Sequence, residues 1–291
     1  MILSIITAID FPSWLREDIF TIGKFSLKWY GLGYFVGIYL AYFYAARLTK
    51  RRDIWIADGA TRVPVIVPTT SILQDVMTYC FVGIIVGGRL GYITLYSPQT
   101  FLTPIEVLKV WEGGMSFHGG FLGVVLAGFY ASWRHKIDKL RIGDIVSVGA
   151  PIGLGIVRFF GNFINQELWG RETTVPWGMR FPKDPDSLVR HPSQLYEAFL
   201  EGLVLFLILR FLTVKYKALT KPGTLFGALM FFYGLFRFSV EFVREPDANL
   251  FGPFTRGMAY SLPMIIVGGA IMFWASRRAP VSPKRIQTED E

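Results

Sequence analysis

Arginine, glutamate and asparagine side chains interrupt long apolar stretches of this sequence. Tyr233, Arg237 and Glu241 are spaced i, i+4 and i+8, so they share one stripe of a helix, and Arg158 and Asn162 are four residues apart in another stretch. An arginine at the centre of a membrane helix costs about 2.5–3.5 kcal/mol on insertion scales, which predicts a polar cavity or acidic partners. A guanidinium fork in such a cavity can bind an anion through two hydrogen bonds. The alternative is that Arg237 and Glu241 form an ion pair that only pins two helices.

Two histidines and a tyrosine stand where other apolar stretches begin. His118 begins the third stretch, His191 precedes the fifth, and Tyr30 begins the first. Histidine titrates near pH 6.5, so at neutral pH it can take a proton from a reacting group. Glu201 is expected to pair with an arginine. Arg89 lies among glycines, and a structural and a functional role are equally compatible with that position.

The elements that position these residues are predicted to be membrane helices. Only 18% of residues are charged, against about 25% in soluble domains, and 52% are hydrophobic. The charges lie between apolar runs long enough to cross a hydrocarbon core, which takes about 20 helical residues. The sequence therefore predicts an all-α, polytopic protein with one membrane domain over residues 1–291. About seven transmembrane segments are expected: 29–47, 72–97, 115–133, 143–164, 193–213, 223–245 and 257–276. The second and fourth are rich in glycine, so both are expected to be central helices.

The distribution of lysine and arginine predicts the orientation. The connections after the odd-numbered segments hold 17 basic residues when the segment-end residues Arg47 and Arg210 are counted with them, whereas the N-terminal arm and the other connections, counted with Arg244, hold 10. The positive-inside rule then places the N-terminus outside and the C-terminus in the cytoplasm. The basic residues lie in short loops without an interleaved aromatic pattern, so the net charge of +8 is explained without a nucleic-acid partner.

This orientation puts the polar residues of several helices in one layer near the outer membrane face. Residues 1–28 are expected to form an interfacial N-terminal arm. Residues 165–191, rich in proline, tryptophan and glycine, are expected to form a small structured cap on the outside. Glu167 is expected to hold this cap.

The residues that form this layer lie in motifs that resemble those of the bacterial phosphatidylglycerol–prolipoprotein diacylglyceryl transferases, and the resemblance covers nearly the whole chain. The matching segments are 29–31 (WYG), 87–92 (GGRLGY), 113–120 (GGMSFHGG), 161–171 (GNFINQELWGR), 190–197 (RHPSQLYE) and 233–237 (YGLFR), followed by Glu241, Phe242, Arg244, Pro246 and Asp247. Several long motifs in the same order are a specific signal, unlike one short pattern.

The resemblance implies a bacterial inner-membrane enzyme that performs the first step of lipoprotein maturation. In this family a diacylglyceryl group passes from phosphatidylglycerol to the lipobox cysteine thiol of a prolipoprotein, and glycerol phosphate leaves. Such a reaction needs a base for the thiol, whose pKa is near 8.5, and cations for the phosphate. The expected catalytic residues are His118, Arg158 and Arg237. Phosphatidylglycerol is expected to contact Arg158, Arg237, Asn162, Tyr30 and Tyr233, with Glu167, Glu241, His191 and Arg89 in support. No cofactor or metal is expected. His191 or an arginine-linked water is the alternative base.

Two positions depart from the family pattern. The family has two residues between the arginine and the asparagine of the fourth segment, whereas Phe159, Phe160 and Gly161 separate Arg158 from Asn162. One extra residue rotates a helix by about 100°. We therefore predict a π-bulge at this point, with a regular helix that leaves Arg158 one turn deeper as the alternative. Near the last segment, Met258 stands where glutamine is expected.

Two other functional classes remain open from the residues alone. An anion transporter could use the same arginines as a binding site, although transporters commonly carry internal repeats and midplane sites, and neither is evident here. A lipid-binding scaffold without catalysis would not explain the segment around His118.

Overall fold

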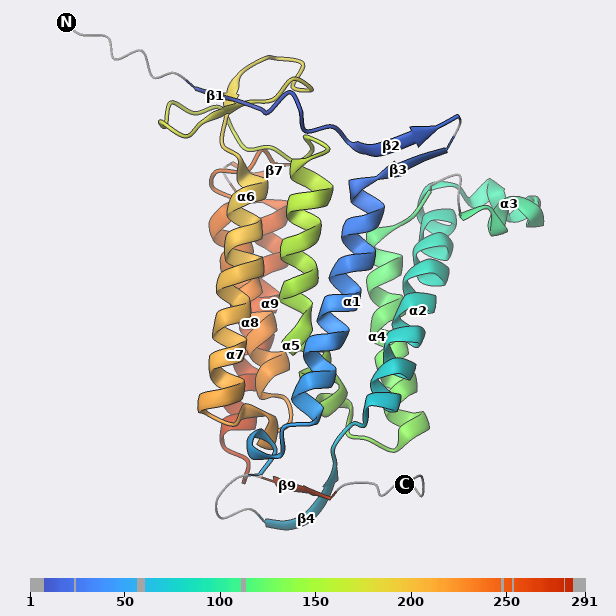
Figure 1. Ribbon diagram of the computed structural model, residues 1–291, viewed down its shortest axis with the longest axis vertical. Coiled ribbons are helices and arrows are strands. Elements are labelled where there is room, and N and C mark those ends of the chain that lie inside the picture. The colour runs from blue at the N-terminus through green and yellow to red at the C-terminus, as the bar shows by residue number, and fades with distance from the viewer. Residues whose placement is uncertain are drawn as a thin grey trace, which may run out of the picture.

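The computed structural model describes residues 8–23, 25–56, 61–110, 114–246, 249–252, 254–279 and 281–284. Long helices stand side by side and make up most of this part of the chain (Figure 1). They are α1 (Trp29–Thr49), α2 (Thr70–Tyr96), α4 (Phe117–His135), α5 (Lys139–Ile156) with η4 (Val157–Phe163), α6 (Ser193–Glu197) with η5 (Ala198–Val204) and α7 (Leu205–Lys215), α8 (Thr224–Val240) and α9 (Arg256–Ser276). Each predicted segment coincides with one of these helical rods.

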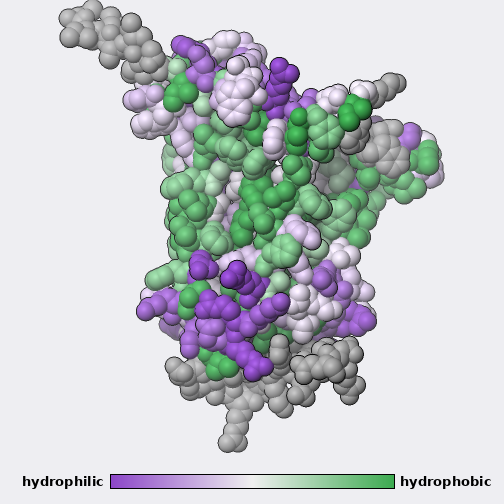
Figure 2. Space-filling view, viewed as in Figure 1, coloured by the Kyte–Doolittle hydropathy of each residue, from purple (hydrophilic) through white to green (hydrophobic). Residues whose placement is uncertain are grey.

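The outer surface of the rods is apolar. Figure 2 shows a hydrophobic band around the middle of the molecule, with hydrophilic groups toward both ends. Among the described residues, three helices are long and apolar enough to cross a membrane, namely 70–96, 139–163 and 256–276, and Thr224–Val240 is a shorter apolar helix. Large side chains such as Phe35, Phe121 and Ile266 are 62–68% exposed. The chain is therefore a mostly helical membrane protein.

Glycines set the distance between α2 and α4. A Cβ added at Gly83 would lie 2.5 Å from the carbonyl oxygen of Gly123, and one added at Gly91 would lie 2.7 Å from the Cα of Gly119. Such close backbone approach is how membrane helices pack with small residues. It also corrects an expectation. Both glycine-rich segments were expected to be central, and α5 is central, since it packs on α1, α4, α7 and α8. The helix α2 instead lies on the flank of the bundle with α4, because its glycines form this one helix pair (Figure 1).

The variant Gly123→Ala is expected to lower stability by about 1–3 kcal/mol, the usual cost of overpacking, because its methyl group would overlap the backbone of Gly83. Thermal unfolding in detergent measures this loss. The control is Gly128→Ala on the same helix, where the new Cβ would meet Ile142 at 4.0 Å. Alanine favours a helix over glycine by about 1 kcal/mol, so the control should be neutral or stabilising. Equal melting temperatures for the two variants would contradict the close packing.

A buried carboxylate joins α5 and α8 at the end of the bundle opposite the cap. Asp144 accepts hydrogen bonds from the backbone N–H groups of Gly223 and Phe226, each at 2.8 Å, and so caps the start of α8. One turn earlier, Arg141 donates to the carbonyl of Leu219 at 2.8 Å. The helix α5 leads into Arg158, and α8 carries Arg237. The hydrogen bonds of Asp144 and Arg141 therefore fix the relative position of the two helices that carry these arginines.

Short strands in the connections complete the fold, which is mostly helical, as predicted, rather than purely so. The strand β1 (Ile9–Asp10) pairs in parallel with β5 (Met179–Arg180), which pairs antiparallel with β6 (Val189–Arg190). Further pairs are β2 (Asp18–Ile22) with β3 (Phe25–Lys28), β7 (Asn249–Phe251) with β8 (Phe254–Thr255), and β4 (Thr61–Ile66) with β9 (Val281–Lys284). Short helices η1 (Arg52–Ile54), η2 (Pro98–Leu102), α3 (Pro104–Leu108) and η6 (Ala218–Thr220) lie in the connections.

The N-terminal arm and the cap form one unit rather than two. Besides the β1–β5 pairing, Phe11 is buried against Phe163 and Phe181, with ring centroids 5.3 and 5.9 Å away. These ring contacts, with the strand pairing, join the described part of the arm to the cap.

Candidate functional site

Glu197 is the common partner of three arginines at the cap end of the bundle. Its carboxylate is fully buried, at 0% exposure, at the end of α6. It lies 3.0 Å from Nε of Arg158, 3.4 Å from Nη1 of Arg237 and 3.6 Å from Nε of Arg244. One acid therefore fixes three cations that come from η4, from α8 and from the residues after α8.

Two further buried acids complete the cluster. Glu201 lies 3.3 Å from Nη2 of Arg158, which confirms that it pairs with an arginine. Glu241 lies 2.8 Å from Nη1 of Arg237 and accepts a hydrogen bond from Thr255 at 2.7 Å. With Glu197, three carboxylates face three guanidinium groups, so the cluster balances its charge in a place where an unpaired charge would be costly.

The structure brings together most of the predicted arginine-site residues. Arg158 donates to Asn162 at 3.2 Å, and Arg237 contacts Glu241, so the predicted ion pair is present. Tyr233, one turn before Arg237, is part-buried and within electrostatic range of both Arg158 and Glu201. Glu197 was not predicted as a site residue. Its signal was available, because it lies four residues before Glu201 on the same helix face and several buried arginines require several acids.

The helix that carries Arg158 contains the predicted π-bulge. Residues Val157–Phe163 are π-helical, and the N–H of Ile164 donates to the carbonyl of Phe159, an i→i+5 bond, at 3.2 Å. The wider turn absorbs the extra residue, so Arg158 and Asn162 lie on one side of the helix within hydrogen-bond distance. A second π-helix, Ala198–Val204, was not predicted and carries Glu201.

The end of α5, just before η4, meets the second π-helix η5 at a pair of glycines. A Cβ on Gly155 would lie 3.0 Å from the Cα of Gly202. This contact holds the two widened turns side by side, and with them Arg158 and Glu201.

The end of α8 differs from the prediction. The helix ends at Val240 instead of continuing to 245, and Arg244 forms a β-bridge with Gly170 of the cap. Arg171 donates to the carbonyl of Arg244 at 3.1 Å. The chain leaves the helix because Arg244 has cap partners on one side and the buried Glu197 on the other.

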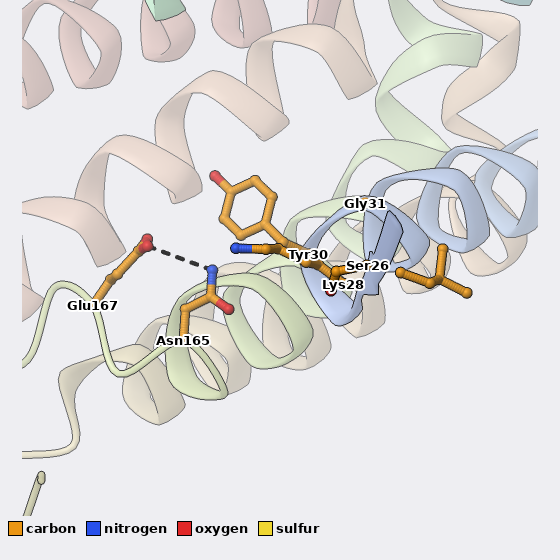
Figure 3. A pocket seen from close by; sticks show the side chains of 7 residues that line it. Ser26, Lys28, Tyr30, Gly31, Asn165 and Glu167 are labelled. Carbon is orange, nitrogen blue, oxygen red and sulfur yellow. Dashed lines mark hydrogen bonds between the residues drawn. The ribbon is translucent and has the colours of Figure 1, made fainter. Parts of the chain in front are cut away.

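A pocket of about 530 Å³ opens beside the cluster. Its lining residues are Ser26, Leu27, Lys28, Tyr30, Gly31, Asn165 and Glu167 (Figure 3). The ring of Tyr30 packs against Gly161 so closely that a Cβ there would lie 3.0 Å from it. The carboxylate of Glu167 accepts from Nδ2 of Asn165 at 3.4 Å, and its main-chain carbonyl accepts from Gln194 at 2.6 Å. Glu167 thus joins the start of the cap to α6 through its backbone, while its side chain lines the pocket.

The two predicted histidines lie in different surroundings. His118 is exposed in the first turn of α4, which packs mainly on α2 and also contacts α5. His191 is half-buried in the cap, and burial lowers its pKa below the ordinary value. The hydroxyl of Tyr196 accepts from the indole N–H of Trp177 at 2.7 Å and lies 3.1 Å from Nδ1 of His191. Which of these two groups donates depends on the tautomer of His191, because the phenol oxygen of Tyr196 can accept a second hydrogen bond as well as donate one.

Arg89 holds a loop. Its side chain is buried, at 8% exposure, and donates to the main-chain carbonyls of Glu106, Val107 (3.1 Å) and Gly114 (3.3 Å). These contacts fix the connection that leads into the segment of His118 and support the structural interpretation of Arg89.

The cap has its own buried ion pair. Arg190 contacts Asp184 at 2.6 Å and Glu245 at 3.3 Å. Burial alone would raise the pKa of Asp184, but hydrogen bonds from Arg190 and from backbone N–H groups outweigh it and lower this pKa below its ordinary value. The pair therefore stabilises the cap at neutral pH and is lost only as the pH falls through the lowered pKa.

Comparisons with known proteins show which family the chain belongs to. The family model described as prolipoprotein diacylglyceryl transferase matches residues 17–274. A Haemophilus influenzae protein named phosphatidylglycerol–prolipoprotein diacylglyceryl transferase is 46% identical over 270 residues, covering 91% of this chain and 94% of its own. A protein of the same name from Bartonella bacilliformis is 42% identical, and the match covers 93% of this chain and 95% of that protein. One from Roseobacter denitrificans is 43% identical, and the match covers 93% of this chain and 97% of that protein. The chain therefore belongs to the prolipoprotein diacylglyceryl transferase family.

Proposed function

We propose that this protein transfers a diacylglyceryl group from phosphatidylglycerol to the lipobox cysteine thiol of prolipoproteins, the first step of lipoprotein maturation. The thiol sulfur forms a bond to the glyceryl carbon, the bond from that carbon to the phosphate oxygen breaks, and glycerol phosphate leaves. The thiol proton passes to a base. The observation that carries this proposal is the three-arginine cluster on Glu197 in a chain of this family.

The arginines suit a phosphate that gains charge as its ester bond breaks. Glu197 and Glu241 both contact the same nitrogen of Arg237, Nη1. The N–H groups on the other two nitrogens of Arg237 can therefore point toward a ligand. Donors that are already oriented stabilise developing charge without reorganising, which is commonly the largest contribution to catalysis. We assign Arg158 and Arg237 to the phosphate, with Asn162, Tyr30 and Tyr233 as hydrogen-bond donors and Glu241 orienting Arg237.

We assign the base to His118. An imidazole with a pKa near 6.5 is suited to accept a proton from a thiol at neutral pH. Burial lowers the pKa of His191 below its ordinary value, which weakens it as a base, so His191 stays the alternative. Arg89 supports His118 by holding the connection before α4.

We further propose that all seven long helical rods cross the bacterial inner membrane, with the cap outside. The arginine cluster would then face the outer leaflet, where the anionic lipid lies and where a signal sequence already crosses the membrane. Both substrates would enter from the side at one depth.

This topology predicts an external N-terminus and a cytoplasmic C-terminus. An alkaline phosphatase fusion at Glu291 should be inactive and a fluorescent-protein fusion there bright, because the two reporters work on opposite sides of the membrane. Fusions in the connection around residue 100 should give the reverse pattern. Phosphatase activity at Glu291 would contradict the orientation.

The deciding experiment is an incubation of the purified protein with phosphatidylglycerol and a lipobox peptide. The expected result is a peptide mass gain equal to one diacylglyceryl group, and none when the peptide's cysteine is replaced by serine. Tight lipid binding without a mass gain would reject the transferase and favour a transporter or a lipid-binding scaffold.

A further inference from the structure

Asn165 leaves a hydrogen-bond acceptor unused inside the pocket. The residue is 7% exposed, and its Oδ1 has no hydrogen-bond partner among the described residues, while its Nδ2 donates to Glu167. A buried acceptor without a partner normally destabilises the fold, so its place in a pocket points to a ligand that donates hydrogen bonds. The carboxylate of Glu167 lines the same pocket and accepts hydrogen bonds only.

The pocket adjoins the arginine cluster. Asn165 lies less than one π-turn beyond Asn162, which bonds to Arg158, and its N–H donates to the carbonyl of Gly161 at 3.2 Å. Tyr30 lines the pocket and is within electrostatic range of both Arg158 and Glu167. A molecule whose phosphate sits at the arginines can therefore extend a short neutral group past Tyr30 into the pocket.

We propose that this pocket binds the terminal glycerol of the donor lipid's headgroup. Asn165 and Glu167 accept hydrogen bonds from its two hydroxyl groups. The inference rests on the proposed function and names the part of the lipid that the enzyme recognises. A neutral diol matches the pocket because its two donors meet two acceptors.

Lys28 distinguishes the diol from a cationic headgroup. Figure 3 shows its ammonium end directed toward the space beside Asn165 and Glu167. An ethanolamine headgroup could also donate to Glu167, but its positive charge would lie next to the lysine ammonium. Lys28 is exposed and also lies 3.9 Å from Glu17, so solvent weakens this repulsion, and the hydrogen-bond donors of a neutral headgroup remain the main basis of selection.

The test compares two donor lipids that differ only in the hydroxyl groups. Phosphatidylglycerol and phosphatidylpropanol with the same acyl chains share the phosphodiester, but the second has no headgroup hydroxyl. With the purified protein and a lipobox peptide, kcat/KM should be at least about tenfold higher for phosphatidylglycerol, because the analogue leaves the acceptors unpaired. Wild-type protein that uses both lipids equally would overturn the inference.

Two variants localise the preference. Asn165→Leu and Glu167→Met remove the acceptors at similar side-chain size and should reduce the ratio of the two kcat/KM values to a few-fold. Glu172→Gln, which changes an exposed cap carboxylate outside the pocket, should keep the wild-type ratio. An unchanged ratio in both pocket variants, or an equal loss on both lipids, would overturn the role of this pocket.

A measurement on the wild-type protein removes any dependence on how the variants fold. Glycerol 1-phosphate should inhibit transfer at least about tenfold more strongly than propyl phosphate, and equal inhibition would overturn the inference. If neither lipid supports transfer, the proposed function fails and this inference fails with it. If transfer occurs without headgroup preference, only the inference fails.

Discussion

Replacing Glu197 with glutamine is expected to lower kcat/KM for lipid transfer by at least about 100-fold, the loss that follows removal of one preorganised group from a charge-stabilising site. The carboxylate is fully buried and contacts Arg158, Arg237 and Arg244. Glutamine keeps the shape but removes the charge, so three guanidinium groups would face two carboxylates. Breaking a buried ion pair from one side costs about 3–5 kcal/mol, and mutual repulsion would move the arginines apart. Steady-state transfer kinetics measure the effect.

The matched control is Glu245→Gln. Glu245 also pairs with an arginine, Arg190, but it is 52% exposed, and exposed pairs contribute about 0–1 kcal/mol. A folded Glu197→Gln protein with wild-type kcat/KM would show that the arginines do not need this acid. Glu201→Gln should have a smaller effect, since Glu201 has one arginine partner among the described ion pairs.

Arg237→Lys is expected to reduce kcat by about 100-fold although it preserves the charge. In the structure one nitrogen of Arg237, Nη1, serves both Glu197 and Glu241. A lysine side chain has one nitrogen and no planar fork. It can therefore bind these acids or a phosphate, but it cannot bind both with the geometry of a guanidinium. Single-turnover rates with saturating phosphatidylglycerol separate this chemical loss from weaker binding.

Arg210→Lys serves as the control for Arg237→Lys, because Arg210 is exposed on α7 and lies outside the cluster. It should transfer lipid at the wild-type rate. If a folded Arg237→Lys protein did so as well, the two-point contact with phosphate would be wrong, and Arg237 would act as a point charge only.

Part of the site could be predicted because the physical constraints on it are local. Tyr233, Arg237 and Glu241 share a helix face through their spacing alone, and the contact of Arg237 with Glu241 follows from it. The π-bulge was also predictable, since one extra residue after Arg158 must be absorbed if that arginine is not to face lipid.

The contacts between helices were not predictable in the same way. The spacing of Glu197 from Glu201 could mark it as one of the acids the arginines require, but only the packing of α6 against η4 and α8 makes it the centre of three arginines. Arg244 was expected inside a helix, but the cap draws its backbone into a β-bridge with Gly170. Such partners are far apart in sequence, so spacing carries no information about them.

The sequence by itself determined which segments are apolar helices, which side chains could not face lipid, and the family to which the chain belongs. Hydropathy and helical period act within one segment, and the cost of exposing an arginine to hydrocarbon acts at one residue. The tertiary structure decided which acid holds which arginine, that the N-terminal arm is part of the cap, and that Asn165 and Glu167 line a pocket. These outcomes depend on how closely whole helices approach one another, and that distance is set by many side chains acting together.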